Sequence, residues 1–441
     1  MGRLFHQASF RARVARENRS RVRDFPPEFL WGSSTSAHQV EGGNIANDWS
    51  EWEGSPGALA IEPSGLAIDQ YERFDDDFAL LASLGQNAHR FSLEWSRIEP
   101  APGTFDGREL KHYADVLTSL HRHGLTPVVT LHHKTVPLWF ARRGGWLAPD
   151  ALEHFTRYVN TVASRLGSQM SYVCTINEPQ IIAVFGHLTG QFPPALRDAP
   201  AAELVNRVLM RAHRIAVTAL REHAPASLVG TCLQLVPLTP LRPDDPEDVE
   251  TTALLRRLMV DDHLAELRAG GDVGDWVGLQ YYTRAAVDSR LPGLIAPASA
   301  DVESTQMGWE IYPEGFGEMI RAAASTGLPV LVTENGVATA DDGQRLRYLQ
   351  SHLHELRAAM RDGVNVRGYL HWSAFDNFEW NHGYMPTFGL IGIDRDNGLE
   401  RIVRPSAVAY GCLATTGQLS ILDAAVDDLD EPVTYVKAET A

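Results

Sequence analysis

The sequence has 441 residues, of which 44% are hydrophobic and 22% are charged. These proportions are typical of a folded globular protein and argue against disorder, and no run approaches the roughly 18 apolar residues that a membrane helix needs. The formal net charge of −17 argues against a nucleic-acid partner, because phosphate binding requires a basic face.

The N-terminal segment is rich in arginine. Seven arginines lie among residues 1–23, and no apolar stretch follows them, so the segment does not fit a secretory signal. An Arg-rich, acid-poor start also resembles an organelle transit peptide. We expect residues 1–24 to form a disordered or loosely docked extension.

From Phe25 onward, eight short apolar runs alternate with segments of helical periodicity. The runs cover 29–34, 88–92, 126–131, 172–177, 227–234, 275–282, 329–335 and 366–373. Parallel strands buried on both faces read as continuous apolar stretches, and eight is the number of strands in a closed (β/α)₈ barrel.

Amphipathic helices are expected between several of these runs. They cover 69–84, 109–123, 150–166 and 345–361. The order strand, helix, strand predicts a parallel sheet, so we expect one α/β domain, a single (β/α)₈ TIM barrel over 25–418. The acidic segment 419–441 follows the last barrel element, and we expect it to be a peripheral tail.

Longer stretches follow some of the runs and are expected to form active-site loops, because such loops follow the carboxyl ends of barrel strands. These stretches are 41–68, 235–250 and 284–312.

Polar residues end several of the runs and should converge on one mouth of the barrel. They include Arg90, His132, His133, Asn177, Glu178, Gln280, Tyr282, Glu334, His371 and Trp372. Glu178 and Glu334 each follow an apolar strand and lie beside an asparagine. Alone, either could be a surface glutamate, but two carboxylates at opposite strand ends can face each other across the mouth.

Paired carboxylates are the groups that glycosidic bond cleavage requires. One protonates the leaving oxygen while the other supports the anomeric carbon. A separation of about 5–5.5 Å leaves no room for water between them, so the second carboxylate attacks and configuration is retained. The nucleophile needs donors that keep it ionised, which Arg90 and Tyr282 can supply.

Seven segments in order give the chain a specific resemblance to glycoside hydrolase family 1, the β-glucosidases and β-galactosidases, over roughly residues 25–415. The segments are FLWGSSTSAHQVEG (29–42), HRFSLEWSRIEP (89–100), TINEP (175–179), DWVGLQYYTR (275–284), MGWEIYPEG (307–315), VTENG (332–336) and HWSAFDNFEWNHGY (371–384).

The resemblance implies a role for each matching residue. Glu178 corresponds to the acid/base and Glu334 to the nucleophile, which Arg90 and Tyr282 contact. Asn177 corresponds to the residue that holds the sugar 2-hydroxyl. The pocket for the glycone, the sugar whose bond is cleaved, corresponds to Gln39, His133, Trp372, Glu379 and Trp380.

Three departures from the family pattern limit what the resemblance implies. Lys134 stands where the family usually has a tryptophan that donates to the sugar, and Gln280 stands where asparagine is common. Lys134 can replace the indole donor, bind an acidic sugar, or point to solvent. The extra methylene of Gln280 can rearrange the support of the nucleophile. Residues 384–387 lack the basic donor of members that act on phosphorylated sugars, which disfavours such substrates.

The sequence therefore predicts a retaining β-glycosidase that acts on small β-D-glucosides, with β-galactosides or β-fucosides as side substrates. A transglycosylase with a hydrophobic acceptor and a non-catalytic sugar-binding relative remain as alternatives. We expect no cofactor, metal, nucleic-acid or membrane partner, and a homo-oligomer is compatible with the sequence. Three scattered cysteines fit neither a disulfide framework nor a zinc site, which favours a reducing, cytoplasmic location.

Overall fold

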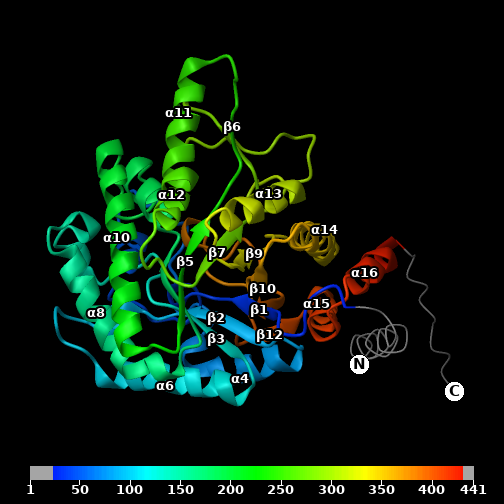
Figure 1. The fold of residues 1–441 in the computed structure, drawn as a ribbon, viewed down its shortest axis with the longest axis horizontal. Coiled ribbons are helices and arrows are strands. Elements are labelled where there is room, and N and C mark those ends of the chain that lie inside the picture. Colours follow the sequence, from blue (N-terminus) through cyan, green and yellow to red (C-terminus); the bar gives the residue numbers. More distant parts are fainter. Residues whose placement is uncertain (1–22, 431–441) are drawn as a thin grey trace.

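A closed barrel of eight parallel strands lies at the centre of the computed structural model, which describes residues 23–430 (Figure 1). Its strands are β1 (Leu30–Ser34), β2 (Ala88–Ser92), β3 (Thr126–Thr130), β4 (Tyr172–Asn177), β5 (Leu228–Gln234), β7 (Trp276–Tyr281), β9 (Val330–Asn335) and β10 (Val366–Trp372). They pair in that order, and β10 closes onto β1. Each strand coincides with one of the eight predicted runs, so the predicted (β/α)₈ barrel is confirmed.

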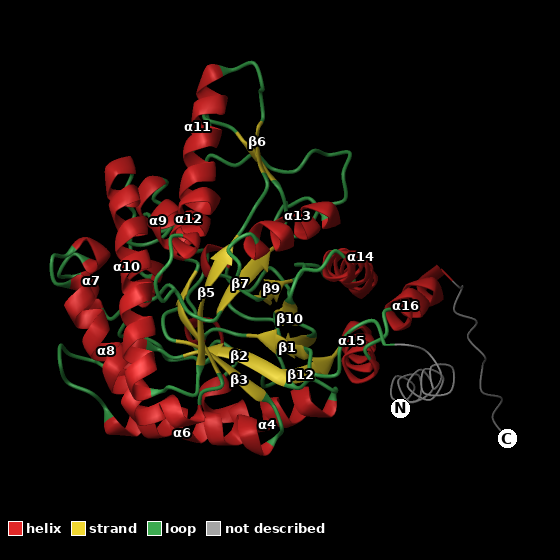
Figure 2. Ribbon diagram, in the orientation of Figure 1, coloured by secondary structure: helices red, strands yellow, loops and turns green. Residues whose placement is uncertain are grey.

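Helices cover the outside of the barrel (Figure 2). Their bounds are α2 (Ala37–Val40), α3 (Asp48–Glu53), α4 (Gln70–Ser83), α5 (Trp95–Ile98), α6 (Gly107–Arg122), α7 (Leu138–Ala141), α8 (Ala151–Leu166), α9 (Pro179–Ala183), α10 (Ala199–His223), α11 (Pro246–Arg256), α12 (Asp262–Arg268), α13 (Pro313–Ala324), α14 (Asp342–Arg361), α15 (Pro405–Thr416) and α16 (Ser420–Asp430). The four predicted helices correspond to α4, α6, α8 and α14. Within residues 23–430, no helix combines the length and the apolar character needed to cross a membrane.

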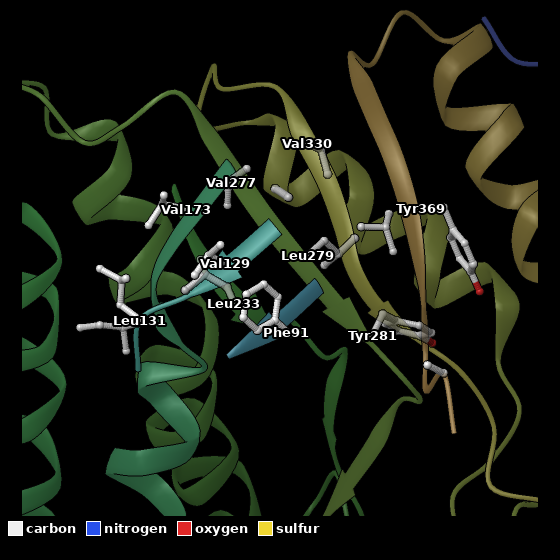
Figure 3. Close-up of a cluster of buried hydrophobic side chains, with 14 of the residues drawn as sticks. Phe91, Val129, Leu131, Val173, Leu233, Val277, Leu279, Tyr281, Val330 and Tyr369 are labelled. Carbon is white, nitrogen blue, oxygen red and sulfur yellow. The ribbon is translucent and has the colours of Figure 1, made fainter. Parts of the chain in front are cut away.

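The barrel strands are buried on both faces, which explains their continuous apolar sequences. One residue from each of seven strands contributes to an interior cluster of Ala88, Val128, Cys174, Cys232, Trp276, Leu331 and Leu370. The opposite faces of the strands pack against the helices through residues such as Val129 and Leu279 (Figure 3). Since side chains alternate along a strand, Arg90 shares the inward face with Ala88 and lies nearer the mouth.

Two small sheets are added to the barrel. Strands β6 (Leu238–Pro240) and β8 (Ala285–Val287) pair in parallel, and β11 (Ile391–Asp394) pairs antiparallel with β12 (Glu400–Val403). With α11, β6 rises above the carboxyl ends of the strands at the top of Figure 1. The β6–β8 sheet therefore stands beside the mouth, within the segments predicted to form active-site loops.

The first part of the expected acidic tail forms helix α16, which packs against α14 and α15. Ile421 and Leu422 are buried in that contact. Residues 1–22 and 431–441 lie outside the described part of the chain, and with them most of the expected Arg-rich extension and the end of the acidic segment.

Candidate active site

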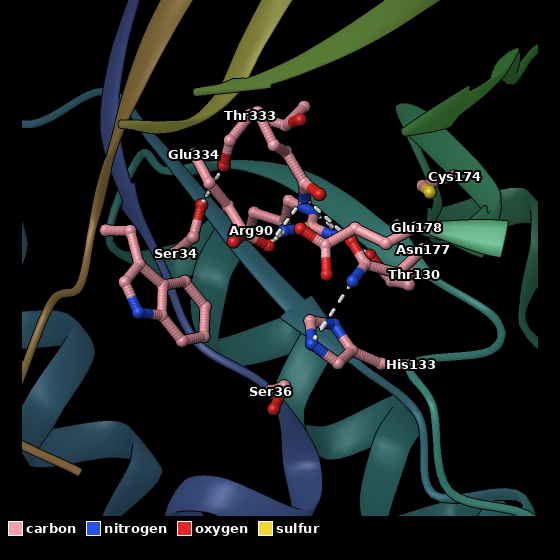
Figure 4. Close-up of polar contacts among 12 residues, drawn as sticks. Ser34, Ser36, Arg90, Thr130, His133, Cys174, Asn177, Glu178, Thr333 and Glu334 are labelled. Atoms are coloured by element: carbon pink, nitrogen blue, oxygen red, sulfur yellow. Dashed lines mark hydrogen bonds and ion pairs between the residues drawn. The ribbon is translucent and has the colours of Figure 1, made fainter. Parts of the chain in front are cut away.

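Arg90, His133, Asn177, Glu178 and Glu334 meet at one mouth of the barrel, as the sequence predicts (Figure 4). His132 and His371, which were expected there too, face the helices instead: His132 packs against Trp146, and His371 against Tyr410 of α15. Side chains alternate along a strand, so the position next to an inward-facing residue faces outward. Glu334 lies in β9, Glu178 follows β4 directly, and Arg90 lies in β2. The two carboxylates are only 4% and 3% exposed, so their charges act in surroundings that screen them much less than water does.

Three donors surround the Glu334 carboxylate. Arg90 Nη1 and Gln280 Nε2 each lie 2.6 Å from its Oε1 atom, and the Tyr282 hydroxyl donates to Oε2 at 2.5 Å. Burial raises the pKa of Glu334, and the nearby charge of Glu178 raises it further, while Arg90 and Tyr282 oppose that shift. These contacts hold Glu334 in a fixed position and favour its ionised form.

Gln280 links Glu334 to Asn177. Its side-chain nitrogen also donates to Asn177 Oδ1 at 2.7 Å, and Arg90 donates to the same oxygen. One amide nitrogen, on a side chain one methylene longer than that of asparagine, therefore contacts both Asn177 and Glu334. Asn177 Nδ2 lies 3.3 Å from His133 Nε2, which extends the network toward the aromatic side of the pocket.

Glu178 forms an ion pair with Lys134. The Lys134 ammonium lies 3.0 Å from Glu178 Oε2, and the lysine side chain is only 12% exposed. It also lies 5.0 Å from the centre of the Trp380 ring, close enough for a cation–π contact. Lys134 thus points into the pocket and not to solvent. Its direct contact is with Glu178, and its charge also opposes the rise that burial causes in the pKa of Glu379.

Three residues of this pocket adopt left-handed backbone conformations, which side chains with a Cβ rarely favour. Lys134, Glu178 and Trp380 have φ angles of 68°, 49° and 50°. Such conformations cost about 1–3 kcal/mol each and persist where the surrounding structure enforces them. Their presence in one pocket indicates that the surrounding structure holds these three residues in unfavourable backbone conformations, which set the directions of their side chains.

The side of the pocket expected to bind the glycone combines aromatic rings with a buried carboxyl group. The His133 ring lies nearly parallel to the rings of Trp372 and Trp380, with centres 6.2 Å apart in both cases. Trp372 Nε1 donates to Glu379 at 3.1 Å. Burial raises the pKa of Glu379 to about 8, and burial holds the pKa of His133 well below its usual range. Burial therefore favours the neutral form of both groups, and flat rings beside hydrogen-bonding groups suit a sugar.

Gln39 is closely engaged with the protein. Its amide nitrogen donates to Asn377 Oδ1 at 3.1 Å and to the Phe378 carbonyl at 2.8 Å, and its oxygen accepts from the Ser36 hydroxyl. The side chain is fully buried. In this structure Gln39 fixes the loop that carries Glu379, and both hydrogens of its amide nitrogen are used within the protein.

Some participants in the site were not expected from the sequence. Thr130 accepts a hydrogen bond from Arg90 Nε at 3.1 Å, and its place at the end of β3 was the available signal. Phe192 and Trp49 pack against the Trp380 ring. Both lie outside the barrel strands, where no local pattern indicates what their side chains contact.

Comparison with known proteins agrees with this geometry. The model of glycosyl hydrolase family 1 matches residues 21–281 and 272–418. The chain belongs to glycosyl hydrolase family 1. It is 31% identical to β-glucosidase A of Thermotoga maritima, over 88% of this chain and 97% of that protein. It is 29% identical to a 1,4-β-D-glucan glucohydrolase of Thermotoga neapolitana, over 88% of this chain and 98% of that protein.

A solved structure of a family member has the same fold. The β-glycosidase from Pyrococcus horikoshii superposes with a TM-score of 0.83 and 35% identity, covering 91% of this chain and 97% of that one. Membership of the family makes this protein a glycoside hydrolase. The resemblance stated from the sequence motifs is thereby confirmed.

Proposed function

We propose that this protein is a retaining β-glycosidase that hydrolyses small β-D-glucosides, with Glu334 as nucleophile and Glu178 as acid/base. The observation that carries the proposal is the environment of Glu334. A buried carboxylate at the barrel mouth is held by Arg90, Gln280 and Tyr282 and lies close enough to Glu178 for the two charges to interact.

In the first step, Glu178 gives a proton to the glycosidic oxygen as the bond to the anomeric carbon breaks. Glu334 attacks that carbon, and a covalent glycosyl-enzyme forms while the aglycone, the group released, departs as an alcohol. Asn177 holds the sugar 2-hydroxyl. Because Arg90 and Gln280 both donate to its oxygen, the amide nitrogen is the group directed toward the sugar side.

In the second step, the Glu178 carboxylate accepts a proton from water, and the oxygen of that water displaces Glu334 from the anomeric carbon. The Lys134 ammonium lies 3.0 Å from Glu178 Oε2, so it borders the carboxyl group that acts in both steps.

The glycone site consists of Trp372 and Trp380 as apolar walls, with His133, Lys134 and Glu379 as polar partners. Lys134 contributes a charge-assisted donor where the family usually has an indole N–H. The names of the relatives from the two Thermotoga species favour glucose as the glycone.

The test is a panel of p-nitrophenyl β-glycosides compared by initial rates, with proton NMR of the sugar first released. The β-glucoside should be cleaved fastest, and the first product should be the β-anomer. Release of the α-anomer would contradict retention, and absence of turnover on every glycoside would contradict the function.

A further inference from the structure

A second cavity adjoins the proposed catalytic pocket. Its volume is about 800 Å³, and its lining begins at Tyr282 and extends between α9 and the β6–β8 sheet. Because the Tyr282 hydroxyl donates to Glu334, the cavity starts one side chain away from the nucleophile. Figure 1 places β6 above the carboxyl ends of the strands, on the side from which substrate enters the mouth.

Most residues that line this cavity are apolar. Ile181 and Met259 form one wall, where they are 2% and 6% exposed, and Val236, Leu238 and Ile295 form another. Trp309 contributes a ring that packs against Tyr282, with centres 5.6 Å apart. The lining offers a ligand extensive apolar contact close to the reacting bond.

The charged residues of the lining are already paired with protein partners. Arg284 forms two hydrogen bonds of 2.7 Å to Glu310, and Asp288 accepts from Arg242 at 2.6 Å. A sugar in this cavity would compete with these pairs for partners. Hydroxyl groups that leave water without gaining partners lose about 1–3 kcal/mol each.

We infer that this cavity binds a bulky apolar aglycone, such as a long alkyl or fused-ring alcohol, in preference to a second sugar. The inference rests on the proposed β-glucosidase function and specifies its substrate class. A volume of about 800 Å³ lies within the range of pockets that enclose ligands of drug size. Each methylene added to an alkyl aglycone would then be buried in the cavity, so binding should strengthen as the alkyl chain becomes longer.

The first experiment measures kcat/KM of the full chain on methyl, hexyl, octyl and decyl β-D-glucosides, on cellobiose, and on β-D-glucosyl fluoride. From methyl to octyl, kcat/KM should rise at least 100-fold, and octyl glucoside should exceed cellobiose at least tenfold. The fluoride carries no aglycone, so its turnover reports the catalytic centre alone. The inference is overturned if the fluoride is turned over but kcat/KM does not depend on the length of the alkyl chain. It is also overturned if kcat/KM is higher on cellobiose than on octyl glucoside. Failure on the fluoride overturns the proposed function instead.

Substitutions in the cavity wall test whether the preference for long alkyl chains arises in this cavity. Leu238→Asp introduces a charge into the wall and Ala286→Trp fills the space without one, and each should lower kcat/KM on octyl glucoside at least tenfold. Turnover of glucosyl fluoride should stay within twofold, which shows that both variants fold. Val249→Asp is the matched control, because Val249 is 44% exposed on α11 and is not part of the lining. Unchanged octyl glucoside turnover in both cavity variants overturns the assignment.

Discussion

Lys134 Nζ lies 3.0 Å from Glu178 Oε2, and the two side chains are 12% and 4% exposed. An enclosed ion pair loses hydration that its mutual attraction must offset, and removal of one partner leaves a buried charge. The family position that usually holds a neutral indole is here occupied by a cation in direct contact with the proposed acid/base. Lys134 is therefore the residue whose replacement is most informative about this chain.

We expect Lys134→Ala to lower kcat/KM on p-nitrophenyl β-glucoside by 10- to 100-fold, or ~1–3 kcal/mol, because a charge-assisted hydrogen bond in the pocket is lost. Lys134→Trp should recover part of that activity by restoring the indole donor. Initial rates on β-glucoside, β-galactoside and β-glucuronide measure both effects.

The matched control is Lys111→Ala, since Lys111 forms an exposed i,i+4 ion pair with Asp115 and should leave all three rates unchanged. Loss confined to the glucuronide would instead assign Lys134 to recognition of an acidic sugar. Unchanged rates on all three substrates would remove Lys134 from the glycone site.

Glu334→Ala should abolish hydrolysis, because no group remains to attack the anomeric carbon. A 2-fluoro β-glucoside should label the wild-type chain at Glu334, since fluorine at carbon 2 slows release of the covalent intermediate. Peptide mapping by mass spectrometry identifies the labelled residue. A label on any other side chain would reassign the nucleophile.

Glu178→Ala should slow substrates with poor leaving groups far more than activated ones, because only the former need a proton in the transition state. The ratio of kcat/KM for 2,4-dinitrophenyl and methyl β-glucosides should rise at least 100-fold over the wild type. Equal losses on both substrates would show that Glu178 is not the acid.

Gln280→Leu should lower kcat by 10- to 100-fold, corresponding to the ~1.5–3 kcal/mol of a hydrogen bond to a charged group. The leucine removes the donor that Gln280 directs to both Glu334 and Asn177. Gln280→Asn keeps an amide on a shorter arm and should lose less. Steady-state kinetics and the rate of inactivation by the 2-fluoroglucoside compare the variants with the wild type. Equal rates for Gln280→Leu and the wild type would show that Gln280 does not support Glu334.

The barrel was predictable because its strands are buried on both faces and so have continuous apolar sequences. The fourth run, 172–177, coincides with β4 at both ends. Helix α14 begins earlier than the predicted 345, because Asp341 caps it through Gly343 N while its first turn is polar. An apolar stripe cannot indicate a turn that carries no apolar residue.

The contacts of the site were less predictable than its members. Strand ends indicated most residues that share the mouth, although His132 and His371 face the helices. Lys134 lies in a loop with a φ of 68°, so the direction of its side chain has no local sequence pattern. The partners of Gln39 lie at Asn377 and Phe378, a contact over more than 300 residues of chain. The β6–β8 sheet has three residues in each strand, too few to give a periodic pattern.

Glu379→Gln should change how the stability of the fold depends on pH. Burial raises the pKa of Glu379 to about 8 from an ordinary value of 4.5, so the folded state binds this proton more tightly than the unfolded state. The stabilisation is fully present below pH 4.5 and is lost as the pH rises toward 8. Wild type should therefore lose roughly 2–4 kcal/mol relative to Glu379→Gln between pH 5 and pH 8.

Urea unfolding at pH 5, 6.5 and 8 measures this difference in the free energy of unfolding. Glu72→Gln, at an exposed position on α4, controls for the loss of one carboxylate from the chain. Glutamine keeps an acceptor for the Trp372 N–H, so a constant offset between Glu379→Gln and wild type would reflect that contact alone. Parallel pH dependences of the two proteins would show that Glu379 is ionised in the folded state across this range, and its neutral form would then have no part in holding the sugar.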